Sequence, residues 1–325
     1  MEYRELGKSG IKISAVGLGT WQWGSREWGW NRLYRKSDVV AAFQKAIELG
    51  VNFIDTAEIY GRGKSEEILG EAVQGHRDEV VIATKVWPLN LSYGRLLKAA
   101  ERSLRRLGVD VIDLYQVHWP NQLVPMRNTM KAMKKLVQEG RVRAVGVSNF
   151  NLKRLKAAQE ALAPLELASN QVRYNLLDRE VEAELLPYAM TEQITIIAYS
   201  PLAQGLLTSR YSSNAKPSSF IQTVNPGFSP RNLNRLVEVN QTLTDIAKTH
   251  GKTSSQVALN WLMRKGNVVP IPGVKKAEHA VDDAAAVGWA IDGEEMERLE
   301  KAAAEVRFDR ISAVPNFLKA LTRSR

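Results

Sequence analysis

The segment VNFIDTAEIYGRGKSEEILGEAVQG, residues 51–75, contains one complete structural unit. It opens with an apolar run that is interrupted by an acid, Asp55, and a tyrosine, Tyr60, follows five positions later. From Ser65 onward, apolar residues recur at spacings of three and four, as in an amphipathic helix, and the stretch ends in glycine, as helices commonly do. The segment therefore predicts a buried strand, a loop that carries Tyr60, and a helix.

The same unit recurs along the whole chain. Apolar runs of strand length occur at residues 15–21, 51–57, 79–85, 110–118, 142–149, 166–172, 194–200 and 267–273. Amphipathic stretches follow them at residues 37–50, 65–75, 94–108, 127–140, 151–163, 179–190, 234–251 and 276–288. Eight alternating pairs favour an α/β fold of the (β/α)8 TIM-barrel class. An open dinucleotide-binding sheet is disfavoured, because Gln22 stands where the third glycine of G-x-G-x-x-G belongs.

We expect residues 1–325 to form a single domain with additions at both ends of the barrel. The first residues predict a β-hairpin with its turn at 7–10, and a C-terminal extension follows the last predicted helix. Residues 206–234 are rich in Ser, Pro and Asn and predict a long covering loop, whose order the sequence leaves open. Ser37 and Ser65 are the expected N-caps of their helices.

The composition limits the possible functions. The chain is 44% hydrophobic and has no cysteine, which excludes disulfides and cysteine nucleophiles. No apolar run reaches the ~20 residues that span a bilayer, and the first residues lack the apolar core of a secretory signal. The net charge of +10 falls on predicted helices beside acids and apolar residues, which indicates solvated faces. We therefore expect a cytoplasmic protein, or a plastid-stromal one after loss of a transit peptide, with no nucleic-acid or membrane partner.

Four polar residues are associated with three consecutive predicted strands. Asp55, Lys85 and His118 each lie at the end of an apolar run, and Tyr60 lies in the loop after Asp55. In a parallel barrel all strand C-termini share one face, where active sites lie. Strand ends are often polar simply because they reach water, but four complementary groups on neighbouring strands predict a catalytic site.

The four residue types suit the protonation of a carbonyl oxygen. A phenol has a pKa of about 10, and an adjacent ammonium lowers it by favouring the phenolate. We therefore expect Lys85 to make Tyr60 more acidic, Asp55 to act as the counter-ion of Lys85, and His118 to orient the substrate oxygen. Reduction of the carbonyl also needs a hydride, which a cofactor must supply.

The sequence resembles the aldo-keto reductases over nearly its whole length. The matching motifs are VGLGTW, FIDTAEIYG, ATK, IDLYQVHWP, VGVSNF, SNQVRYN, IIAYSPLAQG and VVPIPGVKKAEHAVDDAAA, and their order and spacing make the signal strong. Within the family the chain is similar to the longer bacterial, cyanobacterial and plastid-type members, which include pyridoxal reductase-like proteins. Potassium-channel beta subunits belong to the same superfamily.

The resemblance implies a barrel that binds NADP(H) at its C-terminal face and a catalytic tetrad of Asp55, Tyr60, Lys85 and His118. In the family mechanism the tyrosine is the general acid of reduction, and hydride passes from the nicotinamide to the carbonyl carbon. Ser148, Asn149 and Gln171 would hold the nicotinamide carboxamide, and Tyr199 would stack on the nicotinamide ring. The residues after Tyr199 would line the pyrophosphate. The implied cofactor contacts up to this point are Thr20, Trp21, Asp55, Ser148, Asn149, Gln171, Tyr199, Ser200, Pro201, Leu202, Gln204 and Gly205.

The adenosine end of the cofactor would lie on the last strand and helix. Many members of the family have a lysine directly after Ile-Pro, where this chain has Gly273, and the cations appear later as Lys275 and Lys276. Cations suit a ribose 2′-phosphate, so we expect NADPH rather than NADH, although these lysines also fit an ordinary surface. The remaining expected contacts at this end are Ile271, His279, Asp282 and Asp283.

The expected substrate is a small carbonyl compound, because aromatic residues follow the strand ends. Trp21, Trp23, Trp87, His118 and Trp119 are the expected substrate contacts. Two rival functions remain open: a regulatory subunit that binds NADPH without turnover, and an unrelated barrel enzyme such as a sugar isomerase. The second would usually need metal ligands, and we expect no metal site because the chain has four histidines and no H-x-H or H-E-x-x-H pattern.

Overall fold

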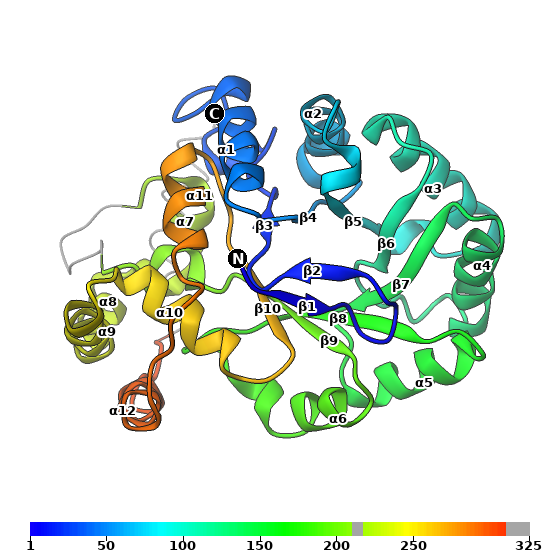
Figure 1. The fold of residues 1–325 in the computed structure, drawn as a ribbon. Coiled ribbons are helices and arrows are strands. Elements are labelled where there is room, and N and C mark those ends of the chain that lie inside the picture. The colour runs from blue at the N-terminus through cyan, green and yellow to red at the C-terminus, as the bar shows by residue number, and fades with distance from the viewer. Residues whose placement is uncertain (210–216, 310–325) are drawn as a thin grey trace.

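A parallel barrel with helices around it forms the centre of the computed structural model, which describes residues 1–209 and 217–309 (Figure 1). The barrel strands of these residues are β3 (Leu18–Gly19), β4 (Phe53–Asp55), β5 (Val81–Val86), β6 (Ile112–Val117), β7 (Val142–Ser148), β8 (Leu167–Arg173), β9 (Thr195–Tyr199) and β10 (Val268–Ile271). Each strand pairs in parallel with its neighbours along the chain. Every strand overlaps one of the eight apolar runs, so the predicted fold class is confirmed.

Backbone bonds between the first and last strands close the barrel. The amide of Gly17 donates to Pro270 at 2.9 Å, and that of Gly19 donates to Pro272 at 2.8 Å. A side chain at Gly17 would place its Cβ 2.8 Å from the Phe53 ring and 2.9 Å from Ile271. The seam between the two strands therefore needs glycine, because neighbouring side chains fill the space beside it.

Helices pack around the outside of the barrel. The eight expected ones are present as α1 (Lys36–Glu48), α2 (Lys64–Ala72), α3 (Tyr93–Leu107), α4 (Met126–Gln138), α5 (Leu152–Leu162), α6 (Leu185–Thr191), α9 (Val237–His250) and α11 (Ala277–Ala284). The helix expected at 179–190 is shorter than expected, because its first part forms a 3-10 turn at Glu180–Glu182. Within the described residues, no helix combines the length and apolar character needed to cross a membrane.

Four further helices in the described residues were not expected: α7 (Phe220–Val224), α8 (Pro230–Arg235), α10 (Ser254–Met263) and α12 (Gly293–Ala304). All ten residues of α10 are buried, so its sequence lacks the one-sided apolar pattern that identifies a surface helix. Helix α7 and all but the last residue of α8 lie in the segment 206–234, of which residues 210–216 are outside the described part. The extension contains α12, which packs on α9, and its last residues, 310–325, also lie outside the described part.

The two expected serine caps are wrong. Helix α1 begins at Lys36, one residue before Ser37, and the side chain of Asp38 accepts a hydrogen bond from the amide of Arg35 at 2.8 Å. Helix α2 begins at Lys64, so Ser65 lies inside it. The hydroxyl of Ser65 is fully buried and bonds other side chains, which makes it unavailable for capping.

The predicted hairpin is present and covers one end of the barrel (Figure 1). Strands β1 (Tyr3–Glu5) and β2 (Lys12–Ser14) pair antiparallel around the expected turn. Leu6, Ile11 and Ile13 join the apolar cluster that fills the barrel interior. The hairpin therefore covers the end of the barrel opposite the strand C-termini, and among the described residues the C-terminal end is the one that stays open.

The contact between α2 and α3 gives a test of the packing. A Cβ added at Gly70 in α2 would lie 2.5 Å from the carbonyl oxygen of Arg106 and 2.7 Å from that of Leu107. Gly to Ala inside a helix usually stabilises by roughly 0.5–1 kcal/mol, but overpacking costs typically 1–3 kcal/mol. We expect Gly70→Ala to lower the free energy of unfolding measured in urea.

Gly94 in α3 is the matched control, because a Cβ added there meets nothing within 4 Å. Gly94→Ala should leave the free energy of unfolding unchanged or slightly raise it. Equal effects of the two substitutions would contradict the steric argument.

Candidate active site

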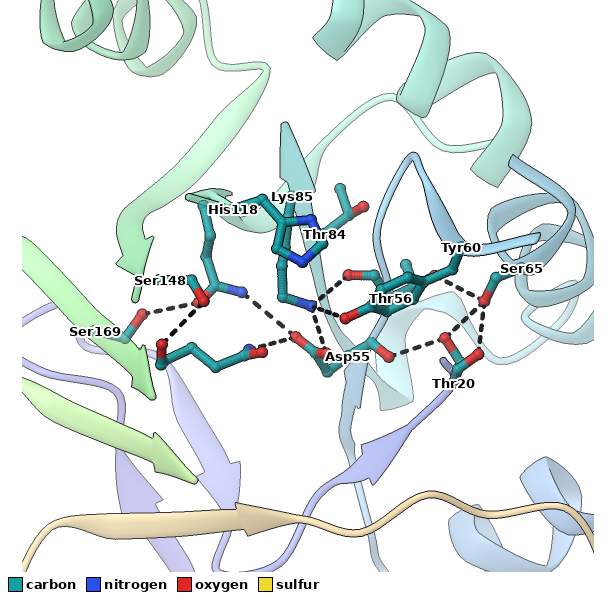
Figure 2. Close-up of polar contacts among 12 residues, drawn as sticks. Thr20, Asp55, Thr56, Tyr60, Ser65, Thr84, Lys85, His118, Ser148 and Ser169 are labelled. Carbon is teal, nitrogen blue, oxygen red and sulfur yellow. Dashed lines mark hydrogen bonds and ion pairs between the residues drawn. The ribbon is translucent and has the colours of Figure 1, made fainter. Parts of the chain in front are cut away.

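The four predicted catalytic residues meet at the C-terminal end of three adjacent strands (Figure 2). Asp55 ends β4, Lys85 lies near the end of β5, and His118 directly follows β6. The ammonium nitrogen of Lys85 lies 2.6 Å from Asp55 Oδ1 and 3.3 Å from the Tyr60 hydroxyl. The rings of Tyr60 and His118 meet edge to face, with centroids 5.7 Å apart. Neighbouring strands thus place all four groups within direct reach of one another.

Asp55 is held on both carboxylate oxygens. While Oδ1 accepts from Lys85, Oδ2 accepts from the Gln171 amide at 2.8 Å and from the Gln116 amide at 3.4 Å. Asp55 is 2% exposed and Lys85 is 0% exposed. A buried ion pair is tolerated only when the remaining polar atoms are also bonded, and here the two amides supply those bonds. Gln116 was not predicted as a site residue. A glutamine in the predicted strand DVIDLYQVH, two positions before His118, could have indicated that it faces the site.

A cluster of buried hydroxyls lies beside the same pair (Figure 2). The Lys85 ammonium also donates to the carbonyl of Thr56 at 2.8 Å. The Ser65 hydroxyl bonds the hydroxyl of Thr20 at 2.7 Å and that of Thr56 at 3.0 Å, and Thr20 donates to the carbonyl of Asp55 at 2.9 Å. These bonds fix the backbone of Asp55 and Thr56. These bonds also hold Thr20 away from the cavity wall. Thr20 was expected to contact the cofactor, but it does not line the cavity.

The acidity of Tyr60 differs from the sequence expectation. Burial raises the pKa of the phenol well above its usual value, and the negative charge of Asp55 raises it further. Burial lowers the pKa of Lys85, whereas Asp55 opposes that shift. The ammonium is closer to Asp55 than to the phenol, so most of its charge is already compensated. In the protein alone Tyr60 is therefore a neutral hydrogen-bond donor rather than an acidified phenol.

His118 is also neutral. Burial lowers its pKa to about 3, and the positive charge of Lys85 contributes to the shift. Among the described residues its Nδ1 atom is buried without a hydrogen-bond partner. A proton on Nδ1 would be a buried donor without an acceptor, which is costly. The neutral ring therefore favours the tautomer with the proton on Nε2, and that N–H is its available donor.

A cavity of about 920 Å³ opens at this end of the barrel. It extends from the Tyr60 and His118 side chains to the start of α11. Of the predicted catalytic, cofactor and substrate residues, those in its wall are Trp21, Asp55, Tyr60, Trp87, His118, Trp119, Ser148, Asn149, Gln171, Tyr199, Ser200, Pro201, Leu202, Gln204, Gly205, Ile271, Gly273, Lys275, Lys276, His279, Asp282 and Asp283. Nearly the whole predicted set therefore lines one cavity.

Trp23 does not line the cavity, although we expected it to contact substrate. Its side chain is 0% exposed, and its indole N–H donates to the carbonyl of Val274 at 2.9 Å. That bond attaches the segment after β3 to the segment after β10. Trp23 therefore stabilises the closure of the barrel, and the spacing of tryptophans in the loop did not reveal which of them points inward.

Hydrogen bonds between side chains organise the wall opposite Asp55. The Tyr199 hydroxyl donates to Asn149 Oδ1 at 3.0 Å, and the Asn149 amide donates to the Ser148 hydroxyl at 3.0 Å. Ser148 in turn donates to the carbonyl of Gln171 at 2.9 Å. Three neighbouring strand ends are thus linked in one line of polar groups. Such a line holds its side chains in fixed positions before any ligand is present.

Several wall residues were not predicted, and six of them come from the loop between β3 and α1. The six are Gln22, Ser25, Glu27, Trp28, Leu33 and Tyr34, and the others come from other segments: Gly19, Ile59, Gly61, Arg62, Arg173, Thr208, Ser218, Ile221, Gln222, Ser255 and Pro272. The Lys275 ammonium lies 5.4 Å from the ring centroids of both Trp28 and Tyr34. Loop positions have no periodic pattern, so the sequence did not predict that Lys275 lies beside two aromatic rings.

The model of the aldo/keto reductase family matches residues 15–304. This chain belongs to the aldo/keto reductase family. An oxidoreductase of Mycobacterium tuberculosis is 41% identical over 94% of each chain. The chloroplastic pyridoxal reductase of Arabidopsis thaliana is 36% identical over 91% of this chain and 84% of its own length.

A solved aldo/keto reductase structure from Klebsiella pneumoniae, in complex with NADP and acetate, has 32% sequence identity and a TM-score of 0.76. The alignment covers 95% of this chain and 99% of that one. The family membership and the barrel confirm the resemblance stated from the motifs. They also exclude an unrelated barrel enzyme.

The buried ion pair gives a test that does not depend on catalysis. Removing one partner leaves an uncompensated buried charge, which costs roughly 3–5 kcal/mol. We expect Lys85→Met to lower the free energy of unfolding by about that amount. Asp55→Asn in the Lys85→Met background should recover much of the loss, because the second substitution removes the orphaned charge.

Urea denaturation of the single and double variants measures the coupling between the two side chains. Additive losses would mean that Asp55 and Lys85 do not stabilise each other. The pair would then not be the electrostatic centre of the site.

Proposed function

We propose that this chain is an NADPH-dependent oxidoreductase that reduces small aldehydes and ketones to alcohols. The observation that carries the proposal is the convergence of a neutral phenol, a buried ammonium and a neutral imidazole at the inner end of one long cavity. The Klebsiella relative in complex with NADP supports the choice of cofactor. The name of the pyridoxal reductase relative supports a small carbonyl substrate.

The cavity has the features that a dinucleotide requires. Its volume of about 920 Å³ is at the upper end of the range for small-molecule sites. Besides His118, two of its wall residues contain buried polar atoms without a hydrogen-bond partner among the described residues, Gln22 Oε1 and Trp28 Nε1. Such atoms are costly unless a ligand or water completes their bonding. Lys275 and Lys276, at the far end, provide positive charge for a 2′-phosphate.

The backbone after β9 suits the middle of a dinucleotide. Ser200, Ala203 and Gln204 all have left-handed backbone conformations, with φ of 50°, 47° and 59°. Non-glycine residues rarely adopt such conformations, and they occur preferentially at binding sites. The turn they form brings the chain along the cavity wall, where a pyrophosphate would lie. Together, Ser148, Asn149 and Gln171 would hold the carboxamide of the nicotinamide, and Tyr199 would lie against its ring.

When bound, the cofactor supplies the hydride, and a side chain of the protein donates the proton. Tyr60 would donate its proton to the carbonyl oxygen as negative charge develops there. A high pKa keeps the phenol protonated before the reaction, and an alkoxide is basic enough to take the proton from it. Lys85 then lies 3.3 Å from the new phenolate and stabilises it. The ammonium therefore acts mainly on the charged product of proton transfer, which is where stabilisation accelerates the reaction.

His118 would orient the substrate rather than protonate it. With its pKa lowered to about 3, the ring is neutral and its Nε2–H can donate a hydrogen bond to the carbonyl oxygen. The Trp87 ring meets His118 edge to face at 5.6 Å and fixes the plane of the imidazole. Trp21, Trp87 and Trp119 give the mouth aromatic walls, which suit apolar or aromatic carbonyl compounds.

A regulatory subunit that binds NADPH without turnover would need the same cavity. Reduction of any member of a panel of aldehydes and ketones, followed by NADPH absorbance, separates the two functions. We expect measurable turnover, because the proton donor and its supporting ammonium are both in place. Tight NADPH binding with no turnover on any substrate would assign the regulatory function instead.

Tyr60→Phe tests the proton donor. General acid catalysis contributes typically 10²–10⁴-fold, so we expect kcat to fall by at least about 100-fold. NADPH affinity, measured by fluorescence titration, should stay within about two-fold, because the substitution removes one hydroxyl and keeps the ring. Undiminished reduction would remove Tyr60 from the role.

Lys275→Ala tests the choice between NADPH and NADH. A charge-assisted hydrogen bond is worth about 1.5–3 kcal/mol, so NADPH affinity should fall roughly 10- to 100-fold. NADH affinity should change little, since NADH lacks the 2′-phosphate. Lys301→Ala, an exposed lysine in α12, is the control and should alter neither affinity. Equal losses for both cofactors would reject the 2′-phosphate contact.

A further inference from the structure

Almost all the net charge of the protein lies on one side of the barrel. Residues 93–160 contain fourteen Lys and Arg against five Asp and Glu, which is +9 of the total +10. This segment includes α3, α4 and α5, which are neighbours on the barrel wall (Figure 1). The cations are therefore unevenly distributed along the chain, although most of those in this segment lie on solvent-exposed helix faces. One sector is strongly basic, and the rest of the molecule is close to neutral.

Four cations of this sector lie in the first turns of their helices, where positive charge is unfavourable. Arg95 is in the first turn of α3, Arg127 in that of α4, and Lys153 and Arg154 in that of α5, while none of these turns contains an acid. Five other described helices, α1, α2, α9, α11 and α12, have an acid in the first turn. A helix N-terminus carries partial positive charge and is stabilised by anions. The placement of these cations therefore costs stability, and a folding requirement does not account for it.

Seven cations near these helix starts form no ion pair with a carboxylate in residues 1–209 and 217–309. They are Arg95, Lys98, Arg127, Lys131, Lys153, Arg154 and Lys156. All are exposed to solvent except Arg154, which is half-buried. The cations of the sector that do pair with acids, such as Arg106 with Glu66, lie farther along the helices or on the strand that follows α4. The unpaired positive charge is thus concentrated around the mouth of the barrel.

Exposed apolar side chains lie beside this charge. Leu89 is 68% exposed in the loop before α3, and Leu123 is 91% exposed in the loop before α4. The Asn121 amide donates to the carbonyl of Pro88 at 3.0 Å, so the two loops are joined. Trp119, 45% exposed, belongs to the second loop and also lines the cavity. The exposed apolar side chains Leu89, Leu123 and Trp119 therefore lie beside the seven unpaired cations. We call these apolar and basic residues together the rim of the barrel mouth.

We propose that this rim docks on an anionic lipid surface. Lys and Arg near such a surface are attracted by its negative potential, and exposed Leu and Trp insert at the headgroup level. Nucleic acid would use the cations but would leave Leu89 and Leu123 without a role, so the apolar tips favour a membrane. In the docked orientation Trp119 lies at the boundary between the cavity and the lipid. The mouth of the cavity then faces the bilayer, where apolar carbonyl compounds partition.

Vesicle sedimentation of the full-length protein tests the proposal. Two preparations are compared, phosphatidylcholine alone and phosphatidylcholine with about one-third phosphatidylglycerol, the anionic lipid whose surface potential attracts basic residues. We expect binding to the anionic vesicles only, and loss of that binding at about 0.5 M salt, where charges are screened. Absence of binding to anionic vesicles at low salt would overturn the proposal.

A triple variant, Arg95→Gln, Arg127→Gln and Lys153→Gln, tests the face itself. Each cation near an anionic surface changes affinity roughly five-fold, so the variant should bind about 100-fold more weakly. Its melting temperature should stay the same or rise, because the variant removes unfavourable charge from three helix starts. A purely structural role for these cations predicts the opposite, a lower melting temperature.

The control is Lys12→Gln, Lys248→Gln and Lys301→Gln, which makes the same change in net charge with exposed lysines of β2, α9 and α12. We expect this control to bind anionic vesicles within a few-fold of the original protein. Equal losses in both triple variants would mean that net charge alone attracts the protein, which overturns a docking face.

Leu89→Ser with Leu123→Ser tests the apolar tips. We expect weaker vesicle binding at low salt and no change in carbonyl reduction in the absence of vesicles. The same basic face could instead hold nucleic acid. Binding of a DNA duplex or single-stranded RNA that depends on Arg95, Arg127 and Lys153, with no binding to vesicles, would overturn the membrane assignment.

Discussion

The buried pair of Asp55 and Lys85 is the interaction on which the site depends. Neither charge is stable alone inside the barrel, so each determines the position of the other. The ammonium lies 3.3 Å from the Tyr60 hydroxyl, and the second oxygen of Asp55 holds Gln171 from the opposite wall. One ion pair therefore connects Tyr60 to the side chains that line the rest of the cavity. The hydroxyls of Thr20, Thr56 and Ser65 keep the strand ends around it in register.

The barrel and the tetrad could be predicted because they follow from local patterns. Each strand is a short apolar run, and parallel strands direct their C-termini to one face, so Asp55, Lys85 and His118 had to lie together. Helix α10 was not predicted because it is buried on all sides. Its sequence therefore lacks the alternation of apolar and polar faces that identifies a surface helix. The caps at Ser37 and Ser65 were wrong because a serine can serve a helix start or a buried hydroxyl cluster, and only the packing decides between them.

The rest of the site depends on distances and loop conformations that the sequence does not contain. The pKa of Tyr60 depends on how deeply the phenol is buried and on how close the charge of Asp55 lies to it, and neither can be read from the sequence. Trp23 and Trp28 lie five positions apart in one loop, yet one supports the barrel seam and the other faces the cavity. The uneven charge of residues 93–160 was present in the sequence, but it becomes a surface only when α3, α4 and α5 are placed side by side.

The amide of Gln171 belongs to two systems at once. It donates to Asp55 and also forms part of the cavity wall. Hydrogen bonds that share one group polarise each other, so a ligand that engages the other side of this amide strengthens its hold on the carboxylate. By thermodynamic reciprocity, a change that weakens the bond between Gln171 and Asp55 must in turn weaken the binding of that ligand. A single glutamine thus couples ligand binding in the cavity to the position of the buried carboxylate.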